Sequence, residues 1–461
     1  MNRKNVDLGT GPVGKLLFSL ALPTITSQIV NMLYNLVDRV YIGHMQPVET
    51  VGKLALTGVG VCLPVIMVIS AFAALVGMGG APRASIEEGR GNISESERIM
   101  GNCFTLLIVI SVVLTVFFQL FSEPLLLIFG ASEATIGYAM DYMRIYCLGT
   151  LFVQLTLGMN AYITAQGFTT VGMKTVLIGA GLNTVLDPIF IFAFDMGVQG
   201  AALATILSQA VSAAWVLRFL TSSRTKWHLR KQYLRPRRKV VLPCLALGLS
   251  PFIMQSTEGV ISVCFNASLQ RYGGDLAVGA MTILASVMQF SMLPLQGLTQ
   301  GAQPIISYNF GAKNARRVKS AFRLLLICCL SYSALLWLLA MVFPGTLASI
   351  FATDKTLISY SAWAMRIYMA ASVIFGAQIA CQQTFIALGN AKTSLFLAVL
   401  RKIILLIPLI LILPLLFRTG EEKVMAVFLA EPVADTLAVL TTVCTFAYQF
   451  RKTMKDLEET A

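Results

Sequence analysis

The sequence has few charged residues for its length. Only 12% of its 461 residues are Asp, Glu, Lys or Arg, and 56% are hydrophobic, whereas a typical soluble domain carries about 25% charged residues. The only two histidines, His44 and His228, lie in or near expected loops, so a histidine-based metal or catalytic site is not expected. The nine cysteines fall mostly in apolar stretches without a CxxC pair, which favours buried thiols over disulfides or metal ligands. The composition argues against a water-soluble enzyme and indicates a membrane protein.

A genuine nucleotide-binding loop is also missing. The segment Gly9–Lys15 fits the pattern GxxxxGK, but such a loop follows a strand and precedes a Ser or Thr. Here only eight residues come before the segment, and Leu16 follows it. We therefore expect no ATP site, and the sequence indicates no other cofactor and no resident metal.

Long apolar runs make up most of the chain instead. A helix that spans a bilayer needs about 20 mainly apolar residues, and lipid offers no partner to unpaired backbone groups. We therefore expect an all-α integral membrane protein. Its twelve expected transmembrane helices are 15–42, 54–80, 100–121, 137–164, 173–194, 198–220, 242–268, 276–303, 321–343, 358–387, 393–416 and 424–449.

The positive charges indicate how the chain is oriented. With the N-terminus inside, the inside segments hold 25 Lys and Arg residues and the outside segments hold 5. Cytoplasmic loops carry this excess of cations, so we expect a multi-pass protein of the cell membrane with both termini cytoplasmic. The basic linker 224–241 has the charge of a cytoplasmic loop near anionic lipid. Neither nucleic acid nor an obligate protein partner is expected.

The two halves of the sequence resemble each other. A constant offset that places Leu54 on Leu276 runs without a gap as far as Gly167 on Gly389, and it places Met143–Tyr146 on Met365–Tyr368. Each half holds six spans, so both halves enter the membrane from the same side and form a parallel repeat. We expect two pseudo-symmetric six-helix bundles, an N-lobe (1–223) and a C-lobe (242–461). Such bundles around a central cavity are typical of transporters.

Polar residues gather on the spans of the first half. Ionisable groups at membrane depth are functional candidates because lipid disfavours them. Spacings of three and four place one set on a single face of span 1: Gln28, Asn31, Tyr34, Asn35 and Asp38. Span 5 carries Asn183 and Asp187, span 4 carries Tyr142, and span 6 carries Thr205 and Gln209. Two carboxylates among such oxygens suit a proton or a monovalent cation, because burial disfavours the charged acid. Each acid taken alone is equally compatible with a structural hydrogen bond.

The spans of the second half carry a different polar set. Glu258 and Asn266 lie on span 7, and Glu431 lies on span 12. Either these acids bind a cationic substrate or a second coupling ion, or they form hydrogen bonds between helices. On span 8, Met288, Gln289 and Met292 fit a polarizable wall for varied ligands as well as ordinary packing.

A proline interrupts the polar face of span 1. Pro23 removes one helical hydrogen bond and is a candidate bend point, or hinge. Arg144 and Arg366 occupy equivalent positions of the repeat, and for both we favour a structural role over a role in substrate binding.

Several motifs resemble the multidrug and toxic compound extrusion (MATE) family over essentially the whole chain. They are LNTVLDPIFIF (Leu182–Phe192), MGVQGAALAT (Met196–Thr205) and QGAQPIISYNFGAKNARRV (Gln300–Val318). AEPVAD (Ala430–Asp435) and the N-terminal GTGPVGKLL resemble the bacterial branch typified by staphylococcal multidrug exporters.

The resemblance implies a V-shaped pair of lobes that export small amphipathic cationic drugs by alternating access, coupled to inward movement of H+ or Na+. It implies an N-lobe cation site, with Na+ as one candidate ion, at Asp38, Asn183, Asp187 and Thr205, with Tyr34 and Tyr142 nearby. Glu258 matches an acid that some members have on span 7. The span 10 acid that accompanies it in some sodium-coupled members is absent here.

Three other functions compete with this interpretation. A flippase for a lipid-linked oligosaccharide would need several cations for a pyrophosphate, and the candidates within or at the ends of spans are Arg39, Arg144, Arg366, Arg401 and Lys402. A membrane-embedded enzyme would need a convergent catalytic cluster, which two loop histidines do not provide. The two-lobe repeat favours a carrier over a channel. We therefore expect a transporter and not an enzyme.

Overall fold

The protein is built from helices. The computed structural model describes residues 7–459, and within that range it contains no strand. The α-helices are α1 (Val13–Gly43), α2 (Lys53–Gly89), α3 (Ile93–Ile128), α4 (Ile136–Leu148), α5 (Thr150–Ala165), α6 (Thr169–Pro188), α7 (Gly197–Leu220), α8 (Arg238–Gly311), α9 (Ala315–Val342), α10 (Pro344–Ser349), α11 (Lys355–Tyr368), α12 (Ser372–Ala387), α13 (Ala391–Val399), α14 (Ile407–Ile412) and α15 (Gly420–Glu459). The short η elements are η1 (Val48–Gly52), η2 (Ile189–Ala193), η3 (Lys231–Tyr233), η4 (Leu400–Leu406) and η5 (Leu413–Leu416).

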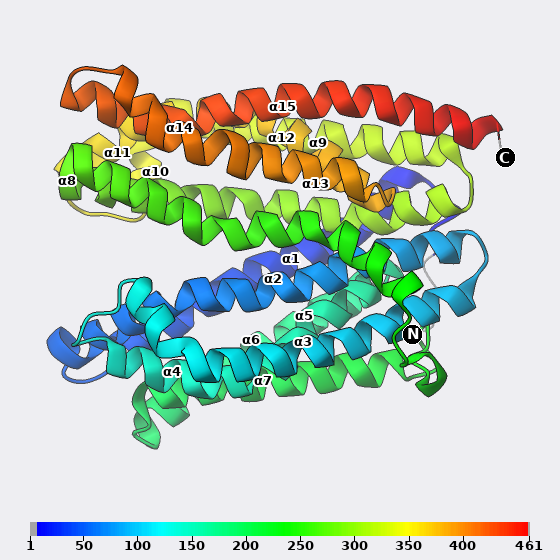
Figure 1. Cartoon of the computed structure of the whole chain (residues 1–461), viewed down its shortest axis with the longest axis horizontal. Helices are drawn as coiled ribbons and strands as arrows, with labels where there is room; N and C mark the ends of the chain where they lie inside the picture. The colour runs from blue at the N-terminus through cyan, green and yellow to red at the C-terminus, as the bar shows by residue number, and fades with distance from the viewer. Residues whose placement is uncertain (1–6, 460–461) are drawn as a thin grey trace.

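Twelve helical segments are long and apolar enough to cross a membrane within residues 7–459. Nine continuous helices meet this requirement, and two further spans are bent pairs, α4 with α5 and α11 with α12. The longest helix, α8, supplies two of the twelve segments because its backbone leaves the helical conformation at Gly274. Figure 1 shows the two parts of α8 running back alongside each other. The expected all-α architecture of twelve spans is therefore confirmed.

Two expected continuous spans are broken in the middle. The axes of α4 and α5 differ by 58°, and those of α11 and α12 differ by 52°. The first break falls at Gly149, where an added Cβ would collide with Cγ2 of Ile206 on α7. Hydropathy alone cannot reveal such a break, since apolar residues continue on both sides of it.

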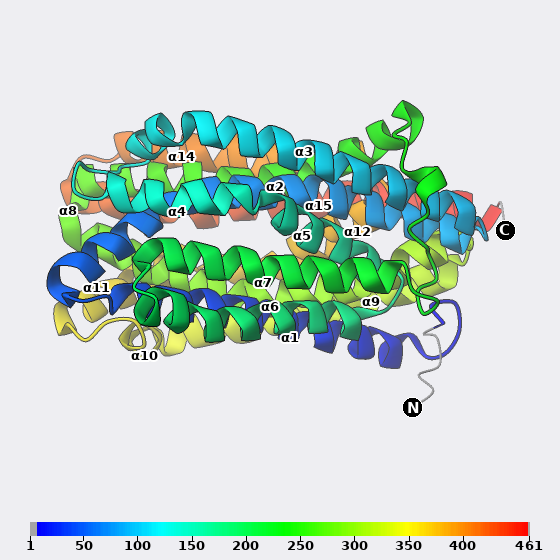
Figure 2. The same ribbon diagram turned by 90° about the horizontal axis from the view of Figure 1, so that it is seen from below.

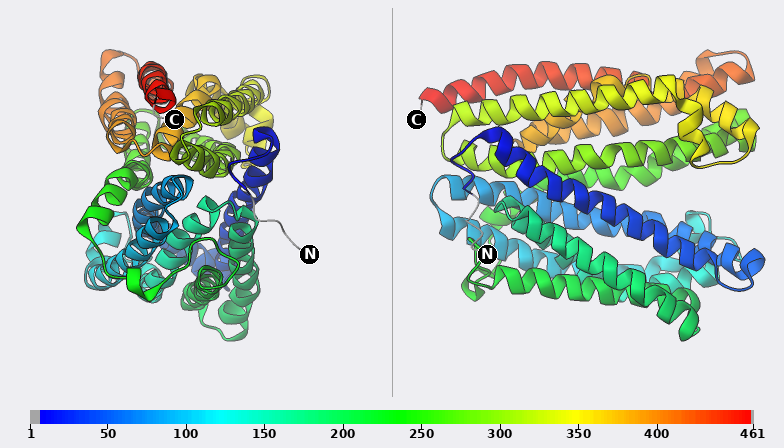
Figure 3. Two further views of the ribbon diagram at one scale, coloured as in Figure 1. Left: turned by 90° about the vertical axis from the view of Figure 1, so that its right-hand side faces the viewer. Right: turned by 180° about the vertical axis from the view of Figure 1, so that it is seen from behind.

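The helices form two groups that follow the order of the sequence. Figure 1 shows α1–α7, coloured blue to green, below α8–α15, coloured green to red. The same two groups are visible from below in Figure 2 and from the end in Figure 3. Helix α1 contacts both α6 of its own group and α8 of the other. We use N-lobe for α1–α7 and C-lobe for α8–α15.

The repeat is visible in the contacts where the lobes meet. A Cβ on Gly89 would collide with the carbonyl oxygen of Tyr308, and a Cβ on Gly311 would collide with that of Ile86. Gly89 and Gly311 are related by the same offset in residue number that aligns the two halves, and so are Ile86 and Tyr308. The end of α2 and the end of α8 therefore contact each other symmetrically, and only glycine allows backbones to approach this closely. The expected pseudo-symmetry is confirmed.

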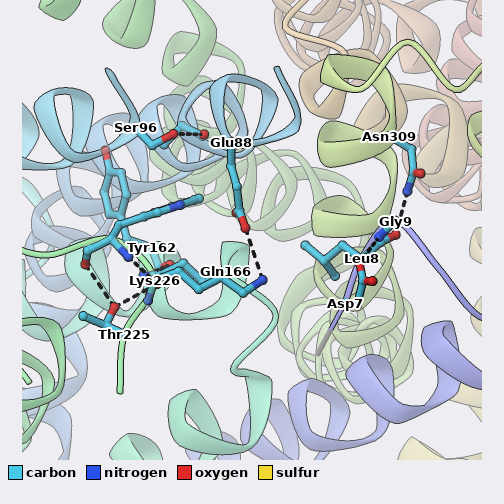
Figure 4. Close-up of polar contacts among 12 residues, drawn as sticks. Asp7, Leu8, Gly9, Glu88, Ser96, Tyr162, Gln166, Thr225, Lys226 and Asn309 are labelled. Atoms are coloured by element: carbon cyan, nitrogen blue, oxygen red, sulfur yellow. Dashed lines mark hydrogen bonds and ion pairs between the residues drawn. The ribbon is translucent and has the colours of Figure 1, made fainter. Parts of the chain in front are cut away.

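The segments outside the membrane spans tie the lobes together at this end of the molecule. In the linker, the Trp227 side chain is fully buried, and the Lys226 ammonium lies 3.1 Å from the Glu88 carboxylate. The GxxxxGK segment also packs against the C-lobe. Asn309 donates to the Leu8 carbonyl over 2.9 Å, and Arg317 donates to the Gly11 carbonyl over 2.8 Å. Figure 4 shows Glu88, Lys226, Leu8 and Asn309.

Candidate functional site

Two buried carboxyl groups meet inside the N-lobe. Asp38 lies near the C-terminal end of α1, and Asp187 lies at the end of α6, directly before Pro188 and the π-helical turn η2. Asp38 is buried and Asp187 is fully buried. The two side chains lie close enough to interact directly. The structure therefore brings together the two acids that the sequence places on spans 1 and 5.

Neighbouring polar side chains complete this group. The Asn183 amide donates to Oδ1 of Asp187 over 3.0 Å and to Oγ1 of Thr205 over 3.4 Å. Tyr34 lies near both carboxyl groups, and Tyr142 lies near Asp38 and Thr205. All six residues of the expected cation site, contributed by α1, α4, α6 and α7, are therefore gathered in one place.

Three oxygens of this group lack a partner. Oδ1 of Asp38, Oδ1 of Asn183 and Oδ2 of Asp187 are buried and accept no hydrogen bond within residues 7–459. Neither acid has a Lys, Arg or His within ion-pair distance in the same range. Buried polar atoms are normally satisfied, so three convergent orphan oxygens point to a bound cation, a proton or water.

A small cavity adjoins this group; we call it the N-lobe cavity. Its volume is about 30 Å³, whereas a water needs about 10–15 Å³. It therefore has room for water or an ion but not for an organic drug. Its lining residues come from α1, α5, α6 and α7: Asn31, Tyr34, Thr156, Leu157, Thr175, Val176, Gly179, Ala180, Asn183, Thr205, Ser208, Gln209 and Ser212.

Sequence reasoning missed four hydroxyl residues of this cavity. Thr156, Thr175, Ser208 and Ser212 look like ordinary helix-packing residues in the sequence, because helical Ser and Thr commonly bond to their own backbone. Thr175 does so, through the Val171 carbonyl at 3.2 Å, whereas Oγ of Ser208 is buried without a partner among the described residues. The available signal is the spacing of Thr205, Ser208, Gln209 and Ser212 on one face of α7.

The acids of the C-lobe have a different environment. Nε of Arg401 lies 2.7 Å from Oδ1 of Asp435, and its NH2 lies 3.1 Å from Oε1 of Glu431. Nζ of Lys402 lies 2.6 Å from Oε1 of Glu258. These five side chains form the C-lobe charge cluster. Both cations lie on η4, a π-helical segment between the first part of α8 and α15.

The C-lobe cluster answers part of the question that the sequence leaves open. Glu258 and Glu431 form ion pairs within their own lobe, and so do Arg401 and Lys402, two of the candidate cations of the flippase hypothesis. Glu431 is buried, but the side chain of Glu258 remains 51% exposed. Only one of the two acids is therefore open on one side.

The remaining substrate candidates do not gather around one pocket. Asn31 lines the N-lobe cavity, Gln28 is half-buried, and Asn35, Asn266 and Gln289 are exposed. Met288 packs against the apolar core of the C-lobe and Met292 against the core shared with α1. For these two methionines the structure provides packing partners, and their role in substrate binding remains a prediction.

The candidate hinge lies within an unbroken helix. Helix α1 continues through Pro23 from Val13 to Gly43. The neighbouring Thr24 hydroxyl donates to the Gly297 carbonyl of α8 over 2.5 Å, and Gly297 lets α8 approach the backbone at Ile25. Pro23 therefore lies beside a close contact between the lobes, and the bend itself remains a prediction.

Residues for a multidentate metal site are not clustered. Within residues 7–459, no group of three or more His, Cys, Asp or Glu side chains could hold a metal ion. The oxygen-rich N-lobe group combines two carboxylates with one amide and hydroxyls. Such hard, partly neutral donors suit a monovalent ion or a proton.

Relatives of the chain are exporters. The multidrug export protein MepA of Staphylococcus haemolyticus (strain JCSC1435) is 24% identical over 426 residues, which cover 92% of each chain. MepA of Staphylococcus aureus (strain NCTC 8325 / PS 47) is 26% identical over 435 residues, covering 93% of each chain. These relatives are transport proteins and not enzymes, in agreement with the sequence-based expectation.

Solved structures share the whole fold. The MATE multidrug transporter DinF-BH, solved with a bound drug, is 33% identical with a TM-score of 0.88, and the match covers 98% of this chain and 99% of that one. An outward-facing MATE family transporter of the MOP superfamily is 21% identical with a TM-score of 0.89, covering 98% and 99%. The MatE family model matches residues 23–189 and 251–412. The two-lobe chain with its buried N-lobe acids therefore belongs to the MatE family of multidrug transporters.

Proposed function

We propose that this protein exports amphipathic organic cations from the cell by alternating access, driven by inward movement of H+ or Na+. The observation that carries the proposal is the Asp38–Asp187 pair. It is buried, has unpartnered oxygens, and has no cationic side chain within ion-pair distance in the described part of the chain. An acid pair with this environment gains stability by taking up a cation from solution. The names of the relatives, multidrug export protein and MATE multidrug transporter, support the drug as cargo.

The proposed coupling follows from the difference between two states of the N-lobe. With the cation bound, Asp38, Asp187 and Asn183 can all direct oxygens toward it. Without it, two carboxylates face each other in an apolar interior and repel. Such a difference can move the equilibrium between outward-open and inward-open conformations only if the cation binds one conformation more tightly. Export then requires that the drug prefers the other.

The ion and the drug are proposed to use different places. The N-lobe cavity is too small for a drug, so we assign it to the ion. Polar residues that remain exposed on helices of both lobes, among them Asn35, Glu258 and Gln289, are proposed to face the drug. Charged side chains avoid lipid, which supports an aqueous space between the lobes on that side.

The location is proposed to be the cell membrane, with both termini in the cytoplasm. The excess of Lys and Arg in the segments assigned inside supports this orientation. The start of α1, the linker and the end of α15 lie at one end of the molecule (Figure 1).

The test is transport by the purified full-length protein in liposomes. Ethidium movement is followed by fluorescence, first under an imposed pH gradient and then under a sodium gradient. We expect one of the gradients to drive transport. We expect Asp38→Asn and Asp187→Asn to reduce it to the level of protein-free liposomes, because each removes one carboxylate of the pair.

Asp275→Asn is the matched control, since Asp275 is an exposed acid at the turn within α8 and lies outside the site. It should transport ethidium at the wild-type rate. Absence of ethidium movement under both gradients would contradict the proposal. So would wild-type transport by both N-lobe variants.

A further inference from the structure

The C-lobe charge cluster carries an excess of negative charge. It contains three carboxylates, Glu258, Glu431 and Asp435, and two cations, Arg401 and Lys402. One negative charge therefore remains uncompensated among these five side chains. Charges in a low-dielectric interior are stable only when they are paired or reach water. The position of the open carboxylate therefore decides where this charge is presented.

Glu258 is the only open member of the cluster. Its side chain is 51% exposed, whereas those of Lys402, Arg401, Glu431 and Asp435 are all 7% exposed or less. One oxygen of Glu258 accepts from the Lys402 ammonium at 2.6 Å. The carboxylate therefore has one side held by a buried cation and another side free for a partner.

The open side faces the region between the lobes. Next to Glu258 on α8, a Cβ on Gly259 would lie 3.7 Å from Pro64 of α2. Two turns earlier, the Phe252 ring contacts the Phe72 ring of α2, with centroids 4.9 Å apart. This part of α8 therefore runs along the N-lobe, and a half-exposed carboxylate there avoids lipid.

The lysine is held in place by its own lobe. A π-helical segment widens the turn of the helix, so that consecutive residues of η4 can reach different neighbours. Arg401 pairs with α15 and stacks on the Phe375 ring at 4.6 Å, and Lys402 reaches α8. With Arg401 anchored on two acids and a ring, Lys402 has little freedom to leave Glu258.

We propose that Glu258 is a subsite for the charged group of an organic monocation, and that Lys402 is a tethered rival cation that weakens binding there. The subsite rests on the function proposed above and names one of its drug contacts. Lys402 neutralises part of the Glu258 charge, so a drug cation gains less than it would from a free carboxylate. Weak binding favours release of the drug on the far side of the membrane.

Equilibrium binding tests this role without any gradient. Ethidium binding to the purified protein in detergent is measured by fluorescence anisotropy. We expect Lys402→Met to bind ethidium about tenfold more tightly, because an exposed carboxylate loses its competing cation. Glu258→Gln should bind about tenfold more weakly. Lys402→Arg keeps the charge and should remain near wild type.

The double variant Glu258→Gln/Lys402→Met removes both charges and avoids leaving a buried ammonium unpaired. It should bind ethidium as weakly as Glu258→Gln. The uncharged dye Nile red should bind all variants alike, and the apparent thermal unfolding midpoint identifies any variant that fails to fold.

Ethidium affinity that is unchanged or lower in Lys402→Met, with the fold intact, would overturn the proposal. The same holds if the tighter binding persists in the double variant, because Glu258 would then not be the contact. Failure of the transport proposal looks different, since the liposomes would show no gradient-driven movement whatever the binding constants are.

Discussion

The two lobes use the same positions of one repeat in opposite ways. The offset in residue number that relates Gly89 to Gly311 also relates Gly179 and Ala180 to Arg401 and Lys402, and it relates Gln209 to Glu431. In the N-lobe these three residues line a cavity. In the C-lobe two of them form the Arg401–Glu431 ion pair, and the third, Lys402, binds Glu258.

This difference separates two ways of placing an acid inside a membrane protein. The N-lobe keeps a cavity and, within the described chain, leaves its acids without a side-chain cation, so the cation must come from outside. The C-lobe fills the corresponding space with side-chain cations that cannot leave. Two lobes of one ancestral plan can thus divide the work, with exchange of ions in one and a fixed charge network in the other.

The largest expected effect comes from removing the fixed cation. Arg401→Met leaves Glu431 and Asp435 buried and unpaired, which should lower the free energy of unfolding by about 3–5 kcal/mol. Unfolding in mixed micelles of increasing SDS content measures it. Asp187→Asn should be far less damaging, because no cationic side chain loses its partner.

Adding Glu431→Gln and Asp435→Asn to Arg401→Met should restore much of the lost stability, since it removes the orphaned charges. If Arg401→Met were as stable as the wild type, the C-lobe cluster would not be a structural network, and the contrast between the lobes would fail.

A second variant breaks the comparison by giving the N-lobe its own cation. Ala180→Lys places an ammonium at the repeat equivalent of Lys402, one helical turn from Asn183. We expect ethidium transport in liposomes to fall nearly to background, because the tethered charge neutralises the acid pair permanently. The control Ala180→Met fills similar space without charge and should retain more activity. Equal activities of the two variants would show that volume, and not charge, matters there.

A third variant sharpens the N-lobe side of the comparison. Asn183→Leu keeps the approximate volume but removes the donor to Asp187 and an oxygen beside it. At a limiting gradient we expect roughly tenfold slower transport, the typical effect of losing a hydrogen bond to a charged group. Gln382→Leu is the C-lobe counterpart, since Gln382 bonds Ser250 away from the charge cluster. A comparable loss in Gln382→Leu would argue that any buried amide matters equally.

The smallest expected effect tests the anchoring of Arg401. Phe375→Leu removes the ring over the guanidinium but keeps both ion pairs. The free energy of unfolding should fall by about 1 kcal/mol, in the range of a buried cation–π contact. The SDS titration measures it alongside Arg401→Met. A loss as large as that of Arg401→Met would place most of the cluster's stability in the ring.

Much of the architecture follows from the sequence because its causes are local or periodic. Long apolar runs give the spans, the excess of cations predicts their orientation, and the constant offset between the halves gives two similar bundles. The face formed by Tyr34 and Asp38 and the pair Asn183 and Asp187 could be identified because helical spacing places residues three or four apart on one side. These acids meet in the structure as expected.

The pairing of charges between distant helices could not be read in the same way. Lys402 and Glu258 are separated by 144 residues, and nothing local links them. The sequence shows acids and bases scattered over four spans, and many pairings of them are compatible with it. The breaks at Gly149 and near Met369 are equally hidden, since the hydropathy is continuous across them.

The sequence by itself determined that the chain crosses a membrane twelve times as two related bundles, and that acids lie on the polar faces of the first. These properties follow from solvent preference and helical period, which act over a few residues at a time. Only the tertiary structure decided which acids acquire a cationic partner. That choice depends on how helices far apart in the chain pack, and on a π-helical turn that points Arg401 and Lys402 toward different neighbours.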